Sequence, residues 1–342
     1  MTDLQSFKPN FLLAVPRVFE KVFNGAQQKS ANEGKEKIFN AAAETAIAFS
    51  RAIESGHIPV GLKIKHKVFN ALVYGKLRAA MGGNVDWSVS GGAALGERLG
   101  HFFRGIGLTI LEGYGLTETA SASTVNIPSH IRVGSVGRPI PGVTIRIAED
   151  GEILVSGAHV FQGYYNNPAA TAEAIDGEGW FHTGDIGRLD EDGYLFITGR
   201  KKELLVTAGG KNVAPAVIED RLRADWLVGQ CMVVGDNKPF IGCLITLDPE
   251  SLPQWLKRHD LDAATPFADL IHNADLIADI QAAVDSANKA VSKAESIRKW
   301  ALIDADWSVE SGHLTPSMKL KRNIVEAEYA SAIADLYDGV RD

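Results

Sequence analysis

Five clusters of glycine, hydroxyl and charged residues contain the residue types that could do chemistry in this chain. They lie at Ser90–Ala93, Glu112–Thr119, Trp180–Asp185, Gly199–Glu203 and Leu314–Lys319. Glycines let a planar ring or a phosphate approach the backbone closely. Hydroxyl and charged side chains can bind phosphate, ribose or a divalent cation. Taken singly, each cluster is more typical of a turn or a helix cap, so a functional hypothesis must rest on all five together.

The second cluster offers the most varied chemistry. Tyr114 lies between Gly113 and Gly115, where its ring can stack on a base. The Thr117 hydroxyl can reach a phosphate, and the Glu118 carboxylate can hold a divalent cation. The alternative is a loop followed by a helix, with Thr117 as the N-cap and Glu118 as a first-turn acid.

The last three clusters supply charges around such a nucleotide. Asp185 follows a glycine and could accept hydrogen bonds from two ribose hydroxyls, and Arg200 could donate to the same ribose. Lys202 lies where a pivot between domains would be. Lys319, on a loop stiffened by proline, could present a point charge to a phosphate.

The elements that must position the first two clusters read as a parallel α/β sheet. Asp86–Ser90 and Leu108–Glu112 are strand-like, and Leu95–Phe103 between them is helix-like. Ligands of such sheets bind at the carboxyl ends of the strands, where both glycine clusters fall as loops.

Two Asp-Gly dipeptides change the pattern downstream. Asp150-Gly151 and Asp192-Gly193 each separate two alternating segments, which predicts hairpins and a small β-barrel or distorted sheet at 131–200. Beyond it we expect a separate α+β part. It would have a helix near 215–224, strands at 231–235 and 240–247, and helices to about 296. Cys231 and Cys243 lie in its apolar strands and are expected to be buried rather than to form a disulfide or zinc site.

Residues 29–81 predict two long helices, at about 35–55 and 62–81. The second has two apolar rows at i, i+4 spacing that are expected to pack inward, Ile64, Val68, Leu72 and Phe69, Val73, Leu77. Its remaining face is basic, with Lys63, Lys65, Lys67, Lys76 and Arg78. Such a face is most often simply solvated; the alternative is peripheral contact of 62–81 with an anionic membrane.

Composition excludes several classes of protein. The 342 residues have a formal net charge of −7 and are 45% hydrophobic, which predicts a folded chain of about two domains and no nucleic-acid partner. No secretion signal or long apolar run occurs, so we expect a cytoplasmic protein, at most peripheral to the inner face of the membrane. The signatures of Walker NTPases, dinucleotide oxidoreductases, zinc proteases and nucleophile-elbow hydrolases are missing from the sequence.

The order and spacing of the five clusters resemble the AMP-binding, adenylate-forming acyl-CoA synthetase and luciferase family. Tyr114–Glu118 is similar to its central motif, Gly184-Asp185 to its ribose motif, Gly199–Glu203 to its hinge motif and Pro316–Arg322 to its C-terminal lysine motif. The resemblance runs from about residue 7 to the end. Val15–Glu20, the helical insert and the C-terminal motif look most like the long-chain fatty acid–CoA ligase branch.

The resemblance implies a two-step reaction. A fatty carboxylate attacks the α-phosphorus of ATP to give an acyl-adenylate and pyrophosphate, and the thiol of CoA then displaces AMP. It implies an adenine pocket of Tyr114, Gly115 and the backbone of Gly91, Gly92, Ala93 and Gly113, with Thr117 on phosphate, Glu118 on Mg²⁺, and Asp185 and Arg200 on ribose. Lys319 would be the adenylation lysine and Lys202 the hinge. Gly209, Gly210 and Lys211 would face the site during CoA transfer.

The implied fold is α/β plus α+β, the adenylate-forming enzyme fold. Residues 1–201 would be the C-terminal part of the large domain, made of the helical insert 29–81, an α/β part 82–130 and a β-barrel part 131–200. Residues 202–342 would be the small mobile domain. The family's Ser/Thr/Gly-rich phosphate loop, which ends in a lysine, does not occur here. We therefore expect a missing N-terminal half and a chain that is inactive alone.

Two alternatives remain open at this point. The enzyme could stop at the acyl-adenylate and load a carrier protein instead of CoA. The chain could also be a non-catalytic nucleotide-binding or assembly fragment.

Overall fold

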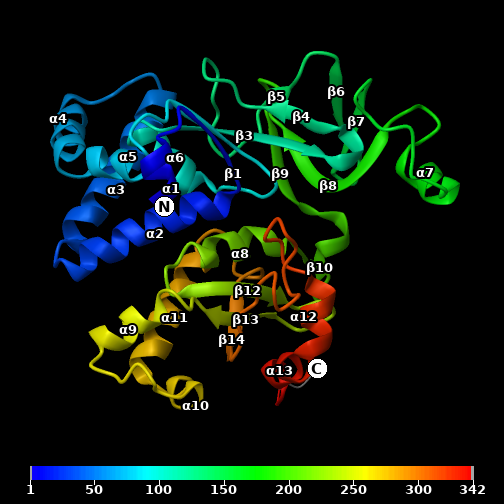
Figure 1. The fold of residues 1–342 in the computed structure, drawn as a ribbon. Helices are drawn as coiled ribbons and strands as arrows, with labels where there is room; N and C mark the ends of the chain where they lie inside the picture. The colour runs from blue at the N-terminus through cyan, green and yellow to red at the C-terminus, as the bar shows by residue number, and fades with distance from the viewer. Residues whose placement is uncertain (1, 340–342) are drawn as a thin grey trace. The chain divides into compact units, whose positions relative to one another are not determined.

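The computed structural model describes residues 2–339 and divides by its internal contacts into two compact units (Figure 1). Unit 1 runs to Ile197 and unit 2 begins at Thr198. Met1 and residues 340–342, the ends of the two predicted domains, lie outside the described residues. The division at 201/202 with Lys202 as pivot stays a prediction. Within the described part of the chain, no helix has the length and hydropathy needed to cross a membrane.

The helices of unit 1 lie mostly before the first glycine cluster. They are α1 (Thr2–Phe7), α2 (Pro16–Asn32), α3 (Glu36–Glu54), α4 (Val60–Phe69), α5 (Gly75–Ala80), α6 (Glu97–Gly105) and α7 (Pro168–Ala174), with a π-helical turn at Asn70–Tyr74. The helix predicted at 35–55 is confirmed as α3. The one predicted at 62–81 is confirmed as a continuous helical segment at 60–80, in which the π-helical turn joins α4 to α5. Sequence reasoning missed α2, which begins at a proline, a residue well suited to the first helical position.

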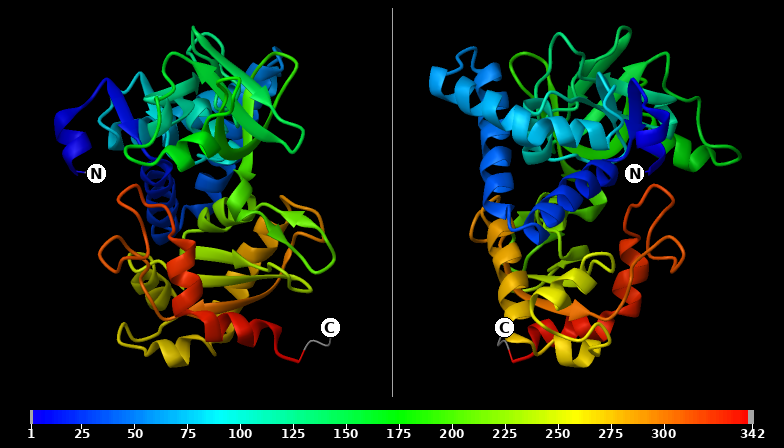
Figure 2. Two further views of the ribbon diagram at one scale, coloured as in Figure 1. Left: turned by 90° about the vertical axis from the view of Figure 1, so that its right-hand side faces the viewer. Right: turned by 60° about the vertical axis from the view of Figure 1, so that its left-hand side comes forward.

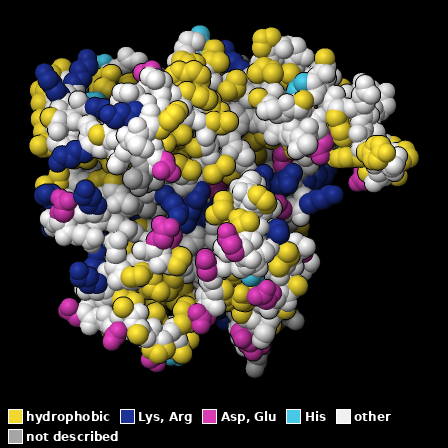
Figure 3. Space-filling model, in the orientation of Figure 1, with side chains coloured by type: hydrophobic (Ala, Val, Ile, Leu, Met, Phe, Trp, Pro, Cys, Tyr) yellow, Lys and Arg dark blue, Asp and Glu magenta, His cyan; other side chains and the backbone are white. Residues whose placement is uncertain are grey.

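The second of these predicted helices buries only one of its two apolar rows. Phe69, Val73 and Leu77 pack on the helical core, as expected. Ile64, Val68 and Leu72 are exposed, so the prediction that they pack inward is wrong. The reason is that α3 and α6 contact the opposite side of α4, where the His66 ring stacks on Phe49 of α3 and faces the Gly105 carbonyl oxygen of α6. Figure 3 shows hydrophobic and basic side chains together over α4 and α5, at the upper left.

Sheet 1, the first sheet of unit 1, has five strands in the order β1-β2-β3-β4-β5. The strands are β1 (Phe11–Ala14), β2 (Trp87–Ser90), β3 (Thr109–Leu116), β4 (Ser121–Val125) and β5 (Arg138–Pro139). Strands β1, β2 and β3 pair in parallel, which confirms the parallel α/β prediction, and β4 and β5 add antiparallel.

One expectation about sheet 1 is wrong. Gly113–Gly115 was expected as a loop but continues β3, because β4 supplies antiparallel hydrogen-bonding partners to it. Strand β4 approaches so closely that a Cβ on Gly115 would lie 1.5 Å from the Ser121 carbonyl oxygen. Only glycine fits there.

Sheet 2, the second sheet of unit 1, has four strands in the order β6-β7-β8-β9. They are β6 (Val143–Ile147), β7 (Glu152–Gly157), β8 (Phe181–Leu189) and β9 (Leu195–Arg200). Both Asp-Gly hairpins form where predicted, and Gly151 and Gly193 have the positive φ that such turns need. The distorted β-barrel part is thus an antiparallel sheet on a small core, to which β3 of sheet 1 contributes Tyr114.

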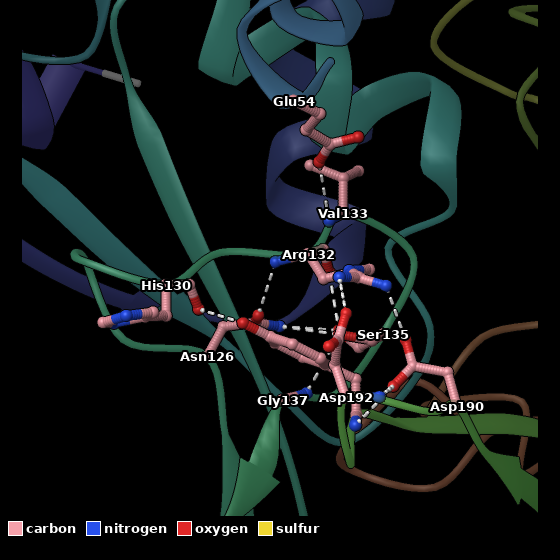
Figure 4. Close-up of polar contacts among 10 residues, drawn as sticks. Glu54, Asn126, His130, Arg132, Val133, Ser135, Gly137, Asp190 and Asp192 are labelled. Atoms are coloured by element: carbon pink, nitrogen blue, oxygen red, sulfur yellow. Dashed lines mark hydrogen bonds and ion pairs between the residues drawn. The ribbon is translucent and has the colours of Figure 1, made fainter. Parts of the chain in front are cut away.

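A loop at 126–137 ties sheet 2 to sheet 1 and to the helices (Figure 4). The Arg132 guanidinium forms ion pairs of 2.7 Å with Asp190 and 2.6 Å with Asp192, in the β8–β9 hairpin. The Asn126 side chain closes the loop by donating to the Ser135 carbonyl oxygen over 2.7 Å. The backbone N–H of Val133 donates to Glu54 at the end of α3. These contacts fix the two sheets of unit 1 relative to each other.

Unit 2 is built on a three-stranded sheet, ordered β12-β13-β14, and a separate two-stranded ribbon, β10-β11 (Figures 1 and 2). Its elements are β10 (Leu205–Val206), β11 (Asn212–Val213), α8 (Pro215–Arg223), β12 (Val228–Val234), β13 (Ile241–Leu247), α9 (Leu252–Arg258), α10 (Phe267–Leu270), α11 (Ala274–Asn288), β14 (Ile297–Ile303), α12 (Arg322–Glu328) and α13 (Ala330–Tyr337). The predicted helix and two strands are confirmed. Strand β14 was missed, and it pairs in parallel with β13.

Both faces of the unit 2 sheet are covered, so β12 and β13 are buried throughout. Side chains of a strand alternate between faces. Cys231 and Val233 face a core formed with α8, α9 and α11, whereas Met232 and Val234 face Trp307, α12 and α13. Cys243 joins the first core, where burial raises the pKa of its thiol. Both cysteines are buried and free, as predicted.

Candidate nucleotide site

Two of the predicted nucleotide residues meet directly in unit 1. The phenol of Tyr114, on β3, donates a hydrogen bond of 2.7 Å to Oδ2 of Asp185, on β8. Both side chains are buried. A potential base-stacking ring and a potential ribose-binding carboxylate, 71 positions apart in sequence, therefore belong to one site.

A β-bulge in sheet 2 positions Asp185. The pairing of β7 with β8 shifts between Glu152 and Leu154, so β8 bulges at 183–185. Gly184 in this bulge has φ +71°, which an L side chain rarely adopts, and its N–H donates to the Glu152 carboxylate over 2.8 Å. The other Glu152 oxygen lies 3.2 Å from Nδ1 of His182. Glu152 is buried and holds the bulge, a role that sequence reasoning missed because the contact spans 32 positions.

The first glycine cluster lies beside Tyr114. Residues Gly91, Gly92 and Ala93 follow β2, and β2 pairs with β3 so that Ser90 is opposite Glu112. A Cβ placed on Gly91 would lie 3.8 Å from the carbonyl oxygen of Gly113. The backbone of this loop therefore lines the same edge of sheet 1 as Gly113 and Tyr114.

Glu112 is a second buried carboxylate that sequence reasoning did not single out. It lies one residue before Gly113 and accepts a hydrogen bond of 3.2 Å from the backbone N–H of Leu95. This contact closes the segment between Ala93 and α6 onto β3. Glu112 thereby holds the glycine loop in place.

Thr117 and Glu118 lie just past β3. The helix expected there in the alternative interpretation is a 3₁₀ turn of three residues, Thr117–Thr119, and Thr119 rather than Thr117 makes its local side-chain bonds. Thr117 is exposed. The Glu118 carboxylate accepts a hydrogen bond of 2.9 Å from the phenol of Tyr164.

Tyr164 is a further residue that the sequence did not reveal, because it is 46 positions from Glu118. Burial, and then the neighbouring Glu118 carboxylate, raise the pKa of Tyr164. It therefore stays a neutral donor and orients Glu118. Among the described residues, no group of three or more acidic, His or Cys side chains could hold a metal by itself. One carboxylate fits Mg²⁺, which usually takes one or two from the protein and the rest from phosphates and water.

The other predicted residues lie beyond Ile197, where unit 1 ends within β9. Arg200 ends β9, and Lys202 lies in a 3₁₀ turn, Lys201–Glu203. Both side chains are exposed. Their approach to Tyr114 and Asp185 stays a prediction.

Gly209, Gly210 and Lys211 form the tight turn between β10 and β11. The N–H of Gly210 donates to the Thr207 carbonyl oxygen over 2.8 Å, and Gly210 has φ +77°. The Lys211 ammonium lies 3.3 Å from the Glu295 carboxylate. Burial tends to raise the pKa of Glu295, but hydrogen bonds from Ser292 and the charge of Lys211 lower it overall. The structure thus gives Lys211 an acidic partner.

Lys319 is presented by a self-contained loop. A β-bridge joins Leu314 to Leu320, and the backbone N–H of Lys319 donates to the Thr315 hydroxyl over 3.0 Å. Met318 takes a positive φ of 63° at the tip. The Lys319 side chain is exposed.

A buried ion pair holds the end of this loop. Arg322, three residues after Lys319, is 2.7 Å from the Glu219 carboxylate of α8 and also donates to the Val233 carbonyl oxygen of β12. Burial lowers the pKa of Arg322, but Glu219 raises it overall. This pair ties the Lys319 loop to the core of unit 2, and sequence reasoning had not assigned it.

Comparison with known proteins agrees with this arrangement. The family model for AMP-binding enzymes matches residues 1–165, and that for the C-terminal domain of AMP-binding enzymes matches residues 202–341. The long-chain-fatty-acid–CoA ligase FadD15 of Mycobacterium bovis is 55% identical over 335 residues, which are 98% of this chain and 56% of that protein. The chain therefore spans little more than half of that relative.

Two solved structures share the fold. The adenylation domain of a carboxylate reductase from Mycobacterium chelonae superposes with a TM-score of 0.69 at 23% identity, covering 98% of this chain and 47% of that one. The A domain of a carboxylic acid reductase from Segniliparus rugosus, in complex with AMP and a co-purified carboxylic acid, gives 0.69 at 21% identity, covering 98% and 49%. The chain belongs to the AMP-binding enzyme family and has part of the adenylate-forming enzyme fold.

Proposed function

We propose that this chain is the part of an AMP-forming long-chain fatty acid–CoA ligase that binds the nucleoside and carries the adenylation lysine. The observation that carries the proposal is the buried Tyr114–Asp185 hydrogen bond, beside the Gly91–Ala93 loop. It joins two nucleotide motifs that the family resemblance predicts. The name of the 55% identical relative supports the fatty acid and CoA as substrates.

In this proposal unit 1 binds the nucleoside. Adenine lies against Tyr114 and the backbone of the glycine loop, and Asp185 accepts hydrogen bonds from ribose with its carboxylate. Thr117 contacts a phosphate. Glu118, oriented by Tyr164, would hold Mg²⁺. When bound, the metal would neutralise charge on the phosphates.

Unit 2 supplies the groups of the two half-reactions. Lys319 stabilises negative charge on the α-phosphate and the fatty carboxylate, so catalysis rests on positioning and electrostatics rather than on a protein nucleophile. We propose that unit 2 then reorients about Lys202, with Arg200 on the ribose. In that second state the turn of Gly209, Gly210 and Lys211 would line the route by which the CoA thiol reaches the acyl-adenylate. Because Lys211 pairs with Glu295 here, it would exchange this partner for a CoA phosphate.

The 342 residues contain no Ser/Thr/Gly-rich phosphate loop ending in lysine. We therefore expect the purified chain to bind AMP weakly, which calorimetry would detect, and to form no CoA ester. Rapid formation of an acyl-CoA from palmitate, ATP and CoA by this chain alone would contradict that expectation.

The ligase activity is tested in a complete enzyme that contains this chain. Palmitate and ATP should release pyrophosphate, and Lys319→Ala should slow this step by far more than it slows CoA transfer to a supplied acyl-adenylate. Lys257→Ala, at an exposed lysine of α9 that the proposal does not use, serves as control. Absence of pyrophosphate release would refute the proposal. Product formation that needs a carrier protein and ignores free CoA would favour the alternative of carrier loading.

A further inference from the structure

The outer face of α4 has no role in the proposed function. Four apolar side chains spaced four residues apart continue from α4 into the π-helical turn, and all are more than half exposed. Their exposed fractions are 73% for Val60, 61% for Ile64, 51% for Val68 and 55% for Leu72. Residues four apart share one helix face, so they form a single apolar row, here called the outer row.

Lysines flank the outer row on both sides. Lys63 and Lys67 follow Val60 and Ile64 by three positions, which places them on one side of the row. Lys65 precedes Val68 by three positions and lies on the other side. None of the three lysines forms an ion pair with any described residue. No acidic residue occurs between Ser55 and Val85, although the whole chain is acidic.

The opposite face holds the helix in place. Nε2 of His66 lies 2.6 Å from the Gly105 carbonyl oxygen, and the His66 ring stacks on Phe49 with centroids 3.7 Å apart. Phe69 packs on the helical core. The outer row therefore lies on a helix that is already formed, so binding would not cost the free energy of folding that helix.

We propose that the outer row and its lysines bind the surface of an anionic lipid membrane, with the axis of α4 parallel to the surface. An apolar stripe bordered by lysines matches the acyl boundary and the negative headgroups of such a surface. A protein partner fits less well, because lysine is depleted in the buried part of protein interfaces. The proposal rests on contacts of α4 alone and is independent of the proposed ligase reaction.

The test measures sedimentation of the purified chain with vesicles. We expect binding to an equimolar mixture of phosphatidylcholine and phosphatidylglycerol, little binding to phosphatidylcholine alone, and weakening by salt. The triple variant K63Q/K65Q/K67Q should bind about a hundredfold more weakly, at about fivefold per lysine. The matched control K257Q/K289Q/K293Q removes the same charge from exposed lysines of unit 2 and should bind like the unaltered chain.

A second variant tests the apolar part. Ile64→Ser with Val68→Ser should weaken vesicle binding about tenfold while leaving the thermal unfolding midpoint unchanged, because both side chains are mostly exposed. Three results would overturn the proposal. They are no binding of the folded chain to anionic vesicles, binding that neither variant reduces, and self-association that the same variants abolish without any vesicle binding. The last would assign the outer row to a second copy of the chain.

Discussion

The phenol of Tyr114 and the carboxylate of Asp185 share a 2.7 Å hydrogen bond that connects the two sheets of unit 1. The Tyr114 ring is buried against the core of sheet 2, and the bond keeps Asp185 Oδ2 in a fixed place. The bond thus acts on both the adenine and the ribose side of the proposed site.

Removing this bond should weaken nucleotide binding without removing the ring. We expect Tyr114→Phe to lower the affinity of the chain for AMP severalfold and the free energy of unfolding by about 1 kcal/mol. Titration calorimetry and urea unfolding measure the two effects. Tyr165→Phe, at a tyrosine 94% exposed, is the control and should change neither. An AMP affinity unaffected by Tyr114→Phe would separate this bond from nucleotide binding.

The bulge at Gly184 should tolerate no side chain. Gly184→Ala places a Cβ on a residue with φ +71°, at a cost of about 1–2 kcal/mol, and shifts the neighbouring Asp185. Urea unfolding should show the loss of stability, and AMP binding should weaken with it. Gly177→Ala, at a glycine without positive φ and with open space around it, should leave both nearly unchanged. Equal behaviour of the two variants would contradict a strained backbone at Gly184.

Unit 2 should be sensitive to loss of the buried ion pair of Arg322 with Glu219. Arg322→Met leaves a buried carboxylate without its cation and should destabilise the chain by about 3 kcal/mol in urea unfolding followed by tryptophan fluorescence. Adding Glu219→Gln removes that uncompensated charge, keeps an oxygen that accepts the Val233 N–H, and should restore part of the stability. If the double variant is instead less stable than Arg322→Met, the unpaired charge is not the cause.

Acid should destabilise the helical part of unit 1 through His101. This buried side chain is 3.0 Å from the Ser50 hydroxyl, and burial lowers its pKa from 6.5 although Glu54 opposes the shift. The fold thus favours the neutral ring. Its contribution to stability is complete above pH 6.5 and is lost as the pH falls toward the folded-state pKa.

Thermal unfolding at a series of pH values measures this loss. The unfolding midpoint of His101→Gln should fall less between neutral and acidic pH than that of the unaltered chain. His130→Gln, at an exposed histidine, should keep the original slope. Parallel curves for all three proteins would exclude His101 as the titrating group.

The features predicted from sequence were those set by local rules. Asp150-Gly151 and Asp192-Gly193 specify hairpins because their turns need positive φ, and alternation of apolar residues specifies the faces of β12 and β13. Strand β14 was missed because Arg298 and Lys299 break up its apolar pattern at the edge of the sheet. The burial of the outer row on α4 was predicted wrongly. Residue spacing shows which side chains share a helix face, but not whether another element packs on that face.

The supporting residues of the site depended on distant contacts. Nothing in the sequence marks these residues as partners, because the members of each pair are far apart along the chain. The pairs are Glu152 with Gly184, Tyr164 with Glu118, and Glu219 with Arg322. The residues that would touch the nucleotide could be proposed from motif resemblance. Those that orient them could not, because no local pattern marks a contact between such distant positions.

Unit 1 has two separate hydrophobic cores, one under its helices and one inside sheet 2. Sheet 1 reaches the second core through the Tyr114 ring and Leu116 of β3, and the Arg132 ion pairs add a polar link. Because the two cores share no residue, we expect sheet 2 to open locally at a lower free energy than the helical core. A nucleotide that bridges the two sheets would suppress this opening. Nucleotide binding would therefore slow amide hydrogen exchange throughout sheet 2, including at residues that do not contact the nucleotide.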